Sequence, residues 1–334
     1  MNVIIPMAGL GKSLRPHTLT IPKPLIPIAG KPIVQRLVED IAKVCKEEIQ
    51  NVGFVIGAFG KEVEMELINI AAKIGAKGKV YQQAEPLGTA HAVLCAKELL
   101  WGKTIVAFAD TLFKADFQLD IEQEAIVWVQ KVEDPQAFGV VVVNKQNEIE
   151  DFVEKPKSFV SDLAIIGIYY FQKGQKLKQE IQFMIDNNQM DDQEFQLTRA
   201  LETLKNKGVK FVPGEVSDWL DCGNKNATVI TNKKYLEYIK DNNLVAESSK
   251  KHNSVIIPPV YIGENVELYN SVIGPYVSIG DHTTIKDSRI QNSIIQKDNL
   301  IINANLSNSM LGNFVNFKGS SSDLSIGDYN VVSE

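Results

Sequence analysis

The first 245 residues alternate short apolar, β-branched runs with longer segments whose apolar residues recur every three or four positions. The short runs are typical of buried strands, and the longer period is typical of helices packed on a sheet. We predict strands at 2–7, 52–56 and 104–108, and helices at 33–49, 61–74 and 89–100. This alternation predicts an α/β fold, a Rossmann-like layered domain with a mixed, mainly parallel sheet.

The apolar period changes to six residues beyond a polar segment at 242–253. The aliphatic residues of two consecutive rows, separated by a step of five, are Ile256, Ile262 and Leu268, then Ile273, Ile279 and Ile285. A period of six fits neither a helix nor a half-buried strand, but it fits a parallel β-helix. About eighteen residues per turn gives about four coils, although the row blurs at 303–308. We therefore predict domains at 1–245 and 246–334, with an irregular strand-rich tail as the alternative to the second.

Composition narrows the partners that the chain can have. Its 334 residues carry 35 Lys and Arg against 41 Asp and Glu, and the net charge of −6 argues against binding a nucleic-acid duplex. Cys45, Cys95 and Cys222 form no metal-binding pattern and indicate a reducing compartment. The chain opens on a core strand rather than a basic leader, and its apolar runs are shorter than a membrane span. We therefore expect a cytoplasmic protein that does not cross a membrane.

A glycine-rich, basic loop follows the first predicted strand. Segment 8–16 carries Lys12 and Arg15, and Lys23 lies between two prolines shortly afterwards. Backbone N–H groups and cations at the end of a strand are suited to binding phosphates. A solvated turn is the structural alternative for Lys23.

Two common phosphate-binding loops are excluded. A P-loop would need glycine at Pro6, and the prolines after residue 15 prevent the long helix that should follow such a loop. The dinucleotide-binding fingerprint would need its third glycine at Leu14. The loop is therefore a long, irregular phosphate-binding candidate of another kind.

Asp110 ends the predicted strand that begins at Thr104. Ligands of parallel sheets bind beyond the carboxyl ends of the strands, so we expect Asp110 and the glycine-rich loop at the same edge. A carboxylate there can hold Mg²⁺, which prefers one or two carboxylates together with substrate phosphates. A helix N-cap is the structural alternative for Asp110.

The chain resembles the sugar-1-phosphate nucleotidyltransferase family over most of its length. The family pattern is roughly Gly-x-Gly-Thr-Arg-Leu-x-Pro and then Pro-Lys-Pro-Leu, and this chain has Gly-Leu-Gly-Lys-Ser-Leu-Arg-Pro at 9–16 and Pro-Lys-Pro-Leu at 22–25. The resemblance continues through Gly-Lys-Pro at 30–32 and Trp-Leu-Asp at 219–221, and it extends to a C-terminal hexapeptide-repeat left-handed β-helix. One departure is Ser13, which stands where the family has an arginine that steadies the nucleotide phosphates.

The resemblance implies a set of site residues. The catalytic residues that it implies are Lys23, at the α-phosphate, and Arg15 or Lys12 in place of the missing arginine. The nucleotide-binding residues are Ala8, Gly9, Gly11, Gln83, Gly88 and Thr89. The sugar-phosphate-binding residues are Gly139, Glu154, Lys155, Gly167 and Glu194. Asp110 and Asp221 hold Mg²⁺ in this interpretation, although a turn aspartate is the structural alternative for Asp221.

The activity that the resemblance implies joins a nucleoside triphosphate to a hexose 1-phosphate and releases pyrophosphate. The favoured pair is dTTP or UTP with glucose 1-phosphate, and GTP with mannose 1-phosphate is the alternative pair. A hypothesis of another class is a regulatory subunit that binds sugar nucleotides but is catalytically weak, which the Ser13 departure supports.

The second domain has two possible roles by resemblance, assembly of a homo-oligomer or acetyl transfer to the sugar. Acetyl transfer requires a general base, and His252 and His282 are the histidines in this part of the chain. His252 falls in the predicted linker and His282 at a predicted coil corner. We therefore favour an oligomerisation or regulatory role.

Overall fold

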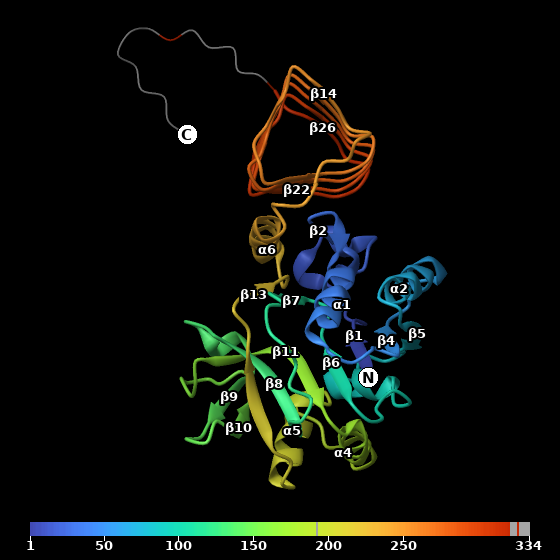
Figure 1. Cartoon of the computed structure of the whole chain (residues 1–334), viewed down its shortest axis with the longest axis vertical. Coiled ribbons are helices and arrows are strands. Elements are labelled where there is room, and N and C mark those ends of the chain that lie inside the picture. The colour runs from blue at the N-terminus through green and yellow to red at the C-terminus, as the bar shows by residue number, and fades with distance from the viewer. Residues whose placement is uncertain (192, 321–325, 327–334) are drawn as a thin grey trace. The chain divides into compact units, whose positions relative to one another are not determined.

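The protein is described here from a computed structural model covering residues 1–191, 193–320 and 326 (Figure 1). Residues 321–325 and 327–334 of the predicted second domain lie outside this part. The chain packs into two compact units. We call the first the sheet unit, made of Met1–Ile26 and Lys31–Ala227, and the second the coil unit, made of Pro27–Gly30 and the residues from Thr228 onward.

Packing divides the chain at Ala227, whereas the sequence places the domain boundary at 245. Most of helix α6 (Lys225–Tyr238) belongs to the coil unit. Asn232 Oδ1 on this helix accepts hydrogen bonds from Ser278 Oγ at 2.7 Å and from Ala29 N at 2.9 Å. The Asn232 side chain thus joins helix α6 both to the coils and to the short segment Pro27–Gly30.

A mixed sheet forms the centre of the sheet unit, as predicted. Its strand order is β10-β9-β11-β6-β1-β4-β5, and β8 pairs with β11 and β12. The strands are β1 (Asn2–Pro6), β4 (Asn51–Ile56), β5 (Lys77–Gln82), β6 (Thr104–Ala107), β8 (Ala125–Lys131), β9 (Val140–Val143), β10 (Ile149–Val153), β11 (Leu163–Phe171) and β12 (Phe211–Glu215). Parallel pairing joins β6, β1, β4 and β5, where strands alternate with helices, whereas β11 is antiparallel to β6, β8 and β9.

The helices of the sheet unit are amphipathic, as their period predicts. They are α1 (Ile33–Val44), α2 (Lys61–Lys73), α3 (Thr89–Cys95), α4 (Gly174–Asp186) and α5 (Leu197–Asn206). Val34, Leu37, Val38 and Ile41 of α1 are buried, as the recurrence of apolar residues every three or four positions predicts. The three predicted helices are shorter than expected, α2 by a single residue. α1 ends before Cys45, whose backbone is extended, and α3 ends where Ala96 N bonds to Val93 O.

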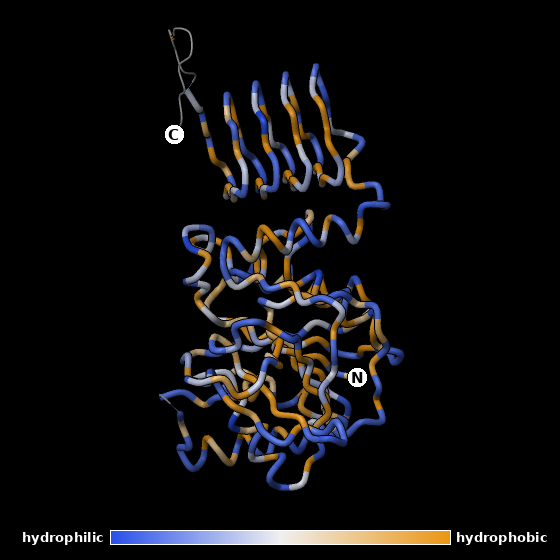
Figure 2. The backbone as a smooth tube through the Cα atoms, turned by 90° about the vertical axis from the view of Figure 1, so that its left-hand side faces the viewer, coloured by the Kyte–Doolittle hydropathy of each residue, from blue (hydrophilic) through white to orange (hydrophobic). Residues whose placement is uncertain are grey.

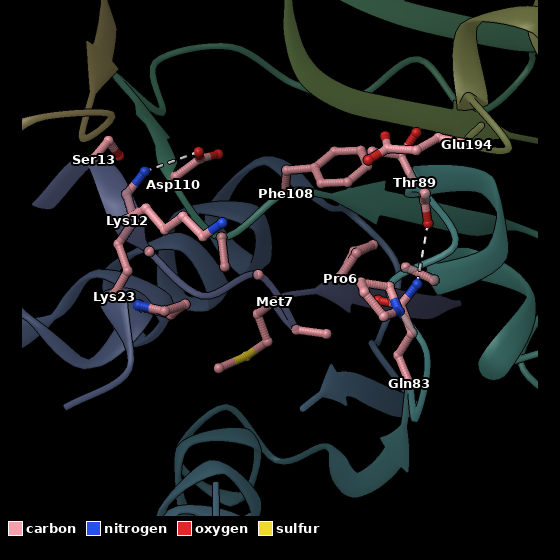
Figure 3. A pocket seen from close by; sticks show the side chains of 18 residues that line it. Pro6, Met7, Lys12, Ser13, Lys23, Gln83, Thr89, Phe108, Asp110 and Glu194 are labelled. Atoms are coloured by element: carbon pink, nitrogen blue, oxygen red, sulfur yellow. Dashed lines mark hydrogen bonds and ion pairs between the residues drawn. The ribbon is translucent and has the colours of Figure 1, made fainter. Parts of the chain in front are cut away.

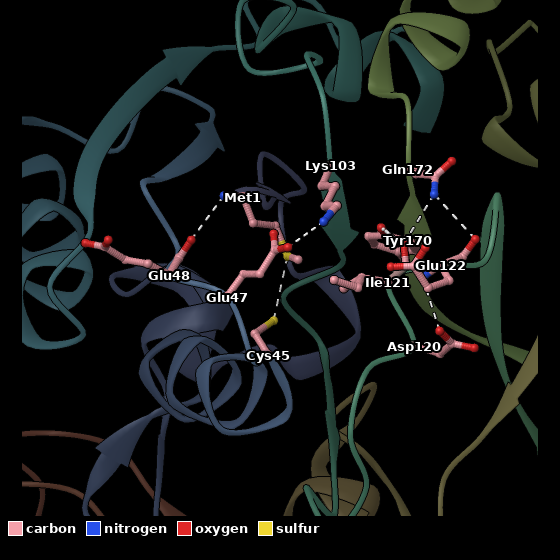
Figure 4. Close-up of polar contacts among 10 residues, drawn as sticks. All are labelled: Met1, Cys45, Glu47, Glu48, Lys103, Asp120, Ile121, Glu122, Tyr170 and Gln172. Atoms are coloured by element: carbon pink, nitrogen blue, oxygen red, sulfur yellow. Dashed lines mark hydrogen bonds and ion pairs between the residues drawn. The ribbon is translucent and has the colours of Figure 1, made fainter.

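The start of the chain is anchored beside the end of α1 (Figure 4). The Met1 amino group donates a hydrogen bond to Glu48 O at 3.0 Å, and Cys45 Sγ lies 3.8 Å from Met1 Sδ. Burial raises the pKa of the Cys45 thiol to about 12, with the charge of Glu47 adding to the effect. This cysteine therefore stays protonated near neutral pH and acts as a packing residue.

Parallel strands stacked in three sheets form the coil unit within the described residues (Figure 2), which confirms the predicted parallel β-helix. The stacks are β14 (Lys250–His252), β17 (Glu267–Tyr269), β20 (Thr284–Lys286), β23 (Leu300–Ile302) and β26 (Asn316–Lys318); β15 (Val255–Ile256), β18 (Val272–Ile273), β21 (Arg289–Gln291) and β24 (Asn305–Ser307); and β16 (Val260–Ile262), β19 (Val277–Ile279), β22 (Ser293–Ile295) and β25 (Met310–Leu311). The aliphatic rows seen in the sequence face inward and are fully or largely buried.

The coils are shorter than the predicted eighteen residues. Leu268 pairs with Ile285, 17 positions on, and Ile285 pairs with Ile301, 16 positions on. Each coil contains at least one step of five residues between inward-facing aliphatic side chains, such as the step from Leu268 to Ile273. Leu306 and Leu311 pack against the same core. The inward row therefore continues through the segment at 303–308 that blurs the period in the sequence.

Asparagine and aspartate occupy one corner of successive coils. Asn253, Asn270, Asp287 and Asn303 all have positive φ, a conformation that asparagine and aspartate tolerate better than most residues. Asn253 Nδ2 donates to Asn270 Oδ1, and Asn270 Nδ2 donates to Asp287 Oδ1, both at 3.0 Å. We call this column the corner ladder. Its side-chain hydrogen bonds link adjacent coils.

Candidate active site

A cavity of about 550 Å³ opens at the carboxyl ends of β1 and β6 in the sheet unit (Figure 3). The predicted residues among its lining are Ala8, Gly9, Gly11, Lys12, Lys23, Gln83, Gly88, Thr89, Asp110 and Glu194. Segments that are far apart in the sequence thus meet at the predicted sheet edge. The volume is in the range of small-molecule sites in proteins.

The glycine-rich loop folds back over Lys23. Gly11 has φ +58°, and a Cβ there would lie 3.1 Å from Lys23 Cβ and 3.1 Å from Thr18 Cγ2. Thr18 Oγ1 donates to Gly11 O at 2.7 Å and holds the turn. Lys12 lines the cavity but is exposed, and Arg15 is exposed and lies outside the lining. Of the two predicted replacements for the missing arginine, Lys12 is therefore the one beside the cavity.

Lys23 and Asp110 form an ion pair in the cavity wall. Lys23 Nζ lies 3.0 Å from Asp110 Oδ2, and the lysine side chain is only 10% exposed while that of Asp110 is 51% exposed. A lysine is almost never buried without a partner, because its charge must be compensated. The alternative of a solvated turn lysine is wrong. Lys23 instead presents a fixed cation to the cavity, with a carboxylate that is still accessible to solvent.

Asp221 is held close to Asp110 by a short antiparallel pair of strands. β13 (Trp219–Asp221) pairs with β7 (Thr111–Phe113), and Cys222 N donates to Asp110 O at 3.0 Å. Burial raises the pKa of the Asp221 carboxyl, and the negative charge of Asp110 adds to this. A hydrogen bond from Gly223 N at 2.7 Å and the charge of Lys23 act in the opposite direction. The two carboxylates therefore repel each other across a partly buried gap.

This pair of carboxylates fits a divalent cation. Mg²⁺ binds oxygen ligands and commonly takes one or two carboxylates plus substrate phosphates and water. Across residues 1–191, 193–320 and 326 there is no group of three or more His, Cys, Asp or Glu that could hold a metal ion. A cation bound by Asp110 and Asp221 would therefore draw its remaining ligands from substrate and water.

Ser13 links the glycine-rich loop to the Asp221 segment. Its Oγ donates to Gly223 O at 2.5 Å, and Gly223 N in turn donates to the Asp221 carboxylate. The sequence shows Ser13 only as a missing arginine, and nothing in the local pattern indicates its partner. The structure gives this residue a connecting role between two loops of the site.

The segment after β5 forms another wall of the cavity. Gln83 N donates to Ile56 O at 2.8 Å, and Gln83 Nε2 donates to Gly88 O at 3.1 Å. Gly88 has φ +106°, and a Cβ there would lie 2.7 Å from both N and O of Phe195, so only glycine fits without movement. Thr89 Oγ1 accepts a hydrogen bond from Leu197 N at 2.9 Å. These contacts position Gln83, Gly88 and Thr89 together.

The predicted sugar-phosphate residues are less closely gathered. Glu194 lines the cavity, and Gly167 O accepts a hydrogen bond from N of the lining residue Phe108 at 2.9 Å. A Cβ on Gly139 would lie 3.1 Å from Glu154 Oε2, which also accepts a hydrogen bond from Thr198 Oγ1 at 2.8 Å. Lys155 is exposed, with Nζ 3.9 Å from Glu154 Oε1. Gly139, Glu154, Lys155 and Gly167 are outside the cavity lining.

Known proteins resemble this chain in sequence and in fold. Residues 2–238 match the sequence model of the nucleotidyl transferase family. The chain is 34% identical, over 72% of its length and 55% of the relative's, to the bifunctional protein GlmU of Methanocaldococcus jannaschii. It is also 34% identical, over 51% of its length and 48% of the relative's, to the mannose-1-phosphate guanylyltransferase catalytic subunit beta of Drosophila melanogaster. The chain thus spans about half the length of these relatives.

A solved structure shares the fold. The complex of UDP-glucose pyrophosphorylase with UDP-glucose aligns with a TM-score of 0.59 and 22% identity, over 71% of this chain and 98% of that one. In the described part of the chain, every helix is too short or too polar to span a bilayer.

Proposed function

Because this chain belongs to the nucleotidyl transferase family, we propose that it transfers a nucleotidyl group from a nucleoside triphosphate to a hexose 1-phosphate. One observation carries the proposal. The nearly buried Lys23 ammonium faces an accessible Asp110 carboxylate at 3.0 Å, with the Asp221 carboxyl held beside it. A cation and two carboxylates at a cavity of small-molecule size are the groups that nucleotidyl transfer requires.

The reaction places most of its demands on electrostatics. A phosphate oxygen of the sugar phosphate attacks the α-phosphorus, a new P–O bond forms in line, and the bond to the leaving pyrophosphate breaks. Lys23 neutralises charge on the α-phosphate, and its burial makes that interaction stronger than it would be in water. Asp110 and Asp221 are the residues that would hold Mg²⁺, which would supply positive charge to offset that of the substrate phosphates. Lys12, in the glycine-rich loop, supplies further positive charge at the cavity, and Arg15 lies farther along the same loop, outside the lining.

The two substrates occupy different walls of the site. The backbone of Ala8, Gly9 and Gly11 approaches the nucleotide, while Gln83, Gly88 and Thr89 contact its base. Glu194 and Gly139 border the sugar, Gly167 keeps the backbone close behind Phe108, and the Glu154–Lys155 pair receives the hydroxyls and phosphate. Lys155 is exposed in the free protein, so this contact requires the side chain to turn toward bound substrate.

The favoured substrates are UTP or dTTP with glucose 1-phosphate. The similarity to a mannose-1-phosphate guanylyltransferase supports GTP with mannose 1-phosphate as the second candidate. A catalytically weak subunit that binds sugar nucleotides is a further candidate, because Ser13 occupies the usual position of an arginine. Lys12, which lines the cavity, is the residue that supplies the missing charge in an active enzyme.

The coil unit assembles the protein into a homo-oligomer in this proposal. The positions of its histidines do not favour acetyl transfer. The exposed His252 ring stacks on Tyr269 with 4.8 Å between ring centroids, and His282 has the positive φ of a coil corner. A cytoplasmic location remains a prediction from composition.

The test is pyrophosphate release by the purified protein with Mg²⁺ and a panel of triphosphates and hexose 1-phosphates. We expect turnover with UTP or dTTP and glucose 1-phosphate that stops when EDTA is added. Calorimetry with the same nucleotides accompanies the assay. Nucleotide binding without turnover for every pair would favour the regulatory subunit, and neither binding nor turnover would refute nucleotidyl transfer.

A further inference from the structure

The orientation of the Gln83 side-chain amide is fixed by its surroundings (Figure 3). Its Nε2 atom lies 3.1 Å from Gly88 O, which also accepts a hydrogen bond from Ala92 N at 3.1 Å. A backbone carbonyl can only accept hydrogen bonds. The amide atom facing Gly88 O must therefore be the NH₂ group, and the usual ambiguity between the nitrogen and oxygen of a glutamine is removed.

The same NH₂ group has a second partner in His91. Gln83 Nε2 lies 3.1 Å from His91 Nδ1 on helix α3. The Gln83 NH₂ group can only donate, so His91 Nδ1 must accept and must be unprotonated. The proton of the neutral His91 ring is therefore on its own Nε2 atom. Burial lowers the pKa of His91, partly offset by the charge of Glu85, which favours this neutral state near pH 7. Gly88 and His91 together occupy the amide hydrogens.

Only an acceptor then remains on Gln83. Its Oε1 atom takes part in no hydrogen bond within the part of the chain that the structure describes, and Gln83 lines the cavity. A ligand group that contacts this oxygen must bring a hydrogen. The ring nitrogen at the pairing edge carries a hydrogen in uracil, thymine and guanine, whereas the corresponding nitrogen of cytosine and adenine is an acceptor.

We propose that His91 is a positioning residue, which holds Gln83 with its carbonyl oxygen toward the nucleotide and thereby selects bases that carry a ring N–H. This inference rests on the proposed function and adds a residue that determines which bases the site accepts. UTP, dTTP and GTP belong to the accepted class, and CTP and ATP to the rejected one. With a rejected base, the lone pair of its ring nitrogen faces the lone pair of Gln83 Oε1, and neither atom has a hydrogen-bond partner. This corresponds to a loss on the order of 10- to 100-fold in affinity.

The test is calorimetric titration of the full chain with UTP and with CTP in the presence of Mg²⁺. We expect the wild-type protein to bind UTP about 10- to 100-fold more tightly than CTP. His91→Phe removes the acceptor and frees one amide hydrogen, so the UTP preference is expected to fall about two- to tenfold. His91→Asn places an amide oxygen near the position of Nδ1 and is expected to keep the preference.

A residue that only packs would behave differently. His91→Phe would then weaken both nucleotides by the same factor, and an unchanged UTP:CTP ratio in this variant overturns the inference. Equal affinity for UTP and CTP in the wild-type protein overturns it too, without any variant, and leaves the proposed function standing. Binding of neither nucleotide by the wild-type protein would instead refute the proposed function, and the inference with it.

Discussion

The two units of this protein use the same polar residue types in opposite ways. In the sheet unit Ser13 Oγ reaches Gly223 O, 210 positions away, and ties two loops around a cavity. In the coil unit Ser271 Oγ accepts a hydrogen bond from Ser288 N, 17 positions on, and repeats a contact made by the coil before it. The sheet unit brings different side chains together at one site, whereas the coil unit repeats the same hydrogen bond from one coil to the next. Substitutions should therefore affect activity in the first and stability in the second.

The largest effect is expected at Asp221 in the sheet unit. Asp221→Asn removes a proposed cation ligand, and turnover should fall about 100-fold or more. Burial and Asp110 raise the pKa of this carboxyl, so its ionised form opposes folding. The asparagine oxygen can still accept the Gly223 hydrogen bond, and Tm at pH 7 should therefore stay within about 2 °C or rise.

The pH dependence of that variant provides its control. The pKa of the Asp221 carboxyl is higher in the folded protein than the value of 3.8 in the unfolded chain. Ionisation of this carboxyl therefore does not lower the free energy of unfolding below pH 3.8, and it lowers that free energy as the pH rises from there through the folded pKa. Any gain in Tm from Asp221→Asn should disappear in acid. Asp186→Asn, at an exposed position at the end of α4, should change neither turnover nor Tm. A large loss of Tm in Asp221→Asn at pH 7 would contradict the expectation that substitutions at the site in the sheet unit affect activity rather than stability.

The next effect is expected at the centre of the coil unit. Ile285 is fully buried, and Ile285→Ala leaves a cavity that should lower the free energy of unfolding of this unit by about 2–5 kcal/mol. Denaturant unfolding followed by circular dichroism measures the loss. Turnover per folded molecule at 25 °C should not change, since the residue lies in the other unit. A parallel loss of turnover would show that the coils support the site.

The smallest effect is expected in the corner ladder. Asn270→Ala removes hydrogen bonds on both sides and places alanine at φ +47°, with an expected loss of about 1–2 kcal/mol. Asn270→Gly is the matched control, because glycine tolerates the backbone conformation but makes no side-chain bonds. Comparing their unfolding midpoints separates backbone conformation from hydrogen bonding. Equal losses would assign the whole effect to the ladder bonds.

Much of the fold was predictable because its signals are local or periodic. The buried runs beginning at Asn2, Val52 and Thr104 became neighbouring parallel strands, since strand and helix alternate along that part of the chain. The inward rows of the coils followed from the spacing of Ile and Leu. The coil length was overestimated, because the ideal of about eighteen residues per turn assumes three steps of six, whereas a step of five such as that from Leu268 to Ile273 recurs in each coil.

The site was predictable as a set of residues but not as a set of contacts. Proline on both sides of Lys23 indicated a fixed lysine, and the structure confirms its burial. The partner of Ser13 could not be found, because a serine hydroxyl has no pattern that points to a carbonyl 210 positions away. Likewise, no local pattern indicates the contact of His91 with Gln83, which depends on how the loop at 84–88 turns.

The bond between Ser13 and Gly223 also bears on how the protein is made. The chain leaves the ribosome from its N-terminus, so the loop that carries Lys23 and the strand that precedes Asp110 emerge long before Asp221. β13 and its partner β7 can pair only after residue 221 has been synthesised. A translation product that stops near residue 215 would contain every strand of the main sheet yet lack the second carboxylate and the anchor of the first loop. Premature termination in this region should therefore yield inert chains.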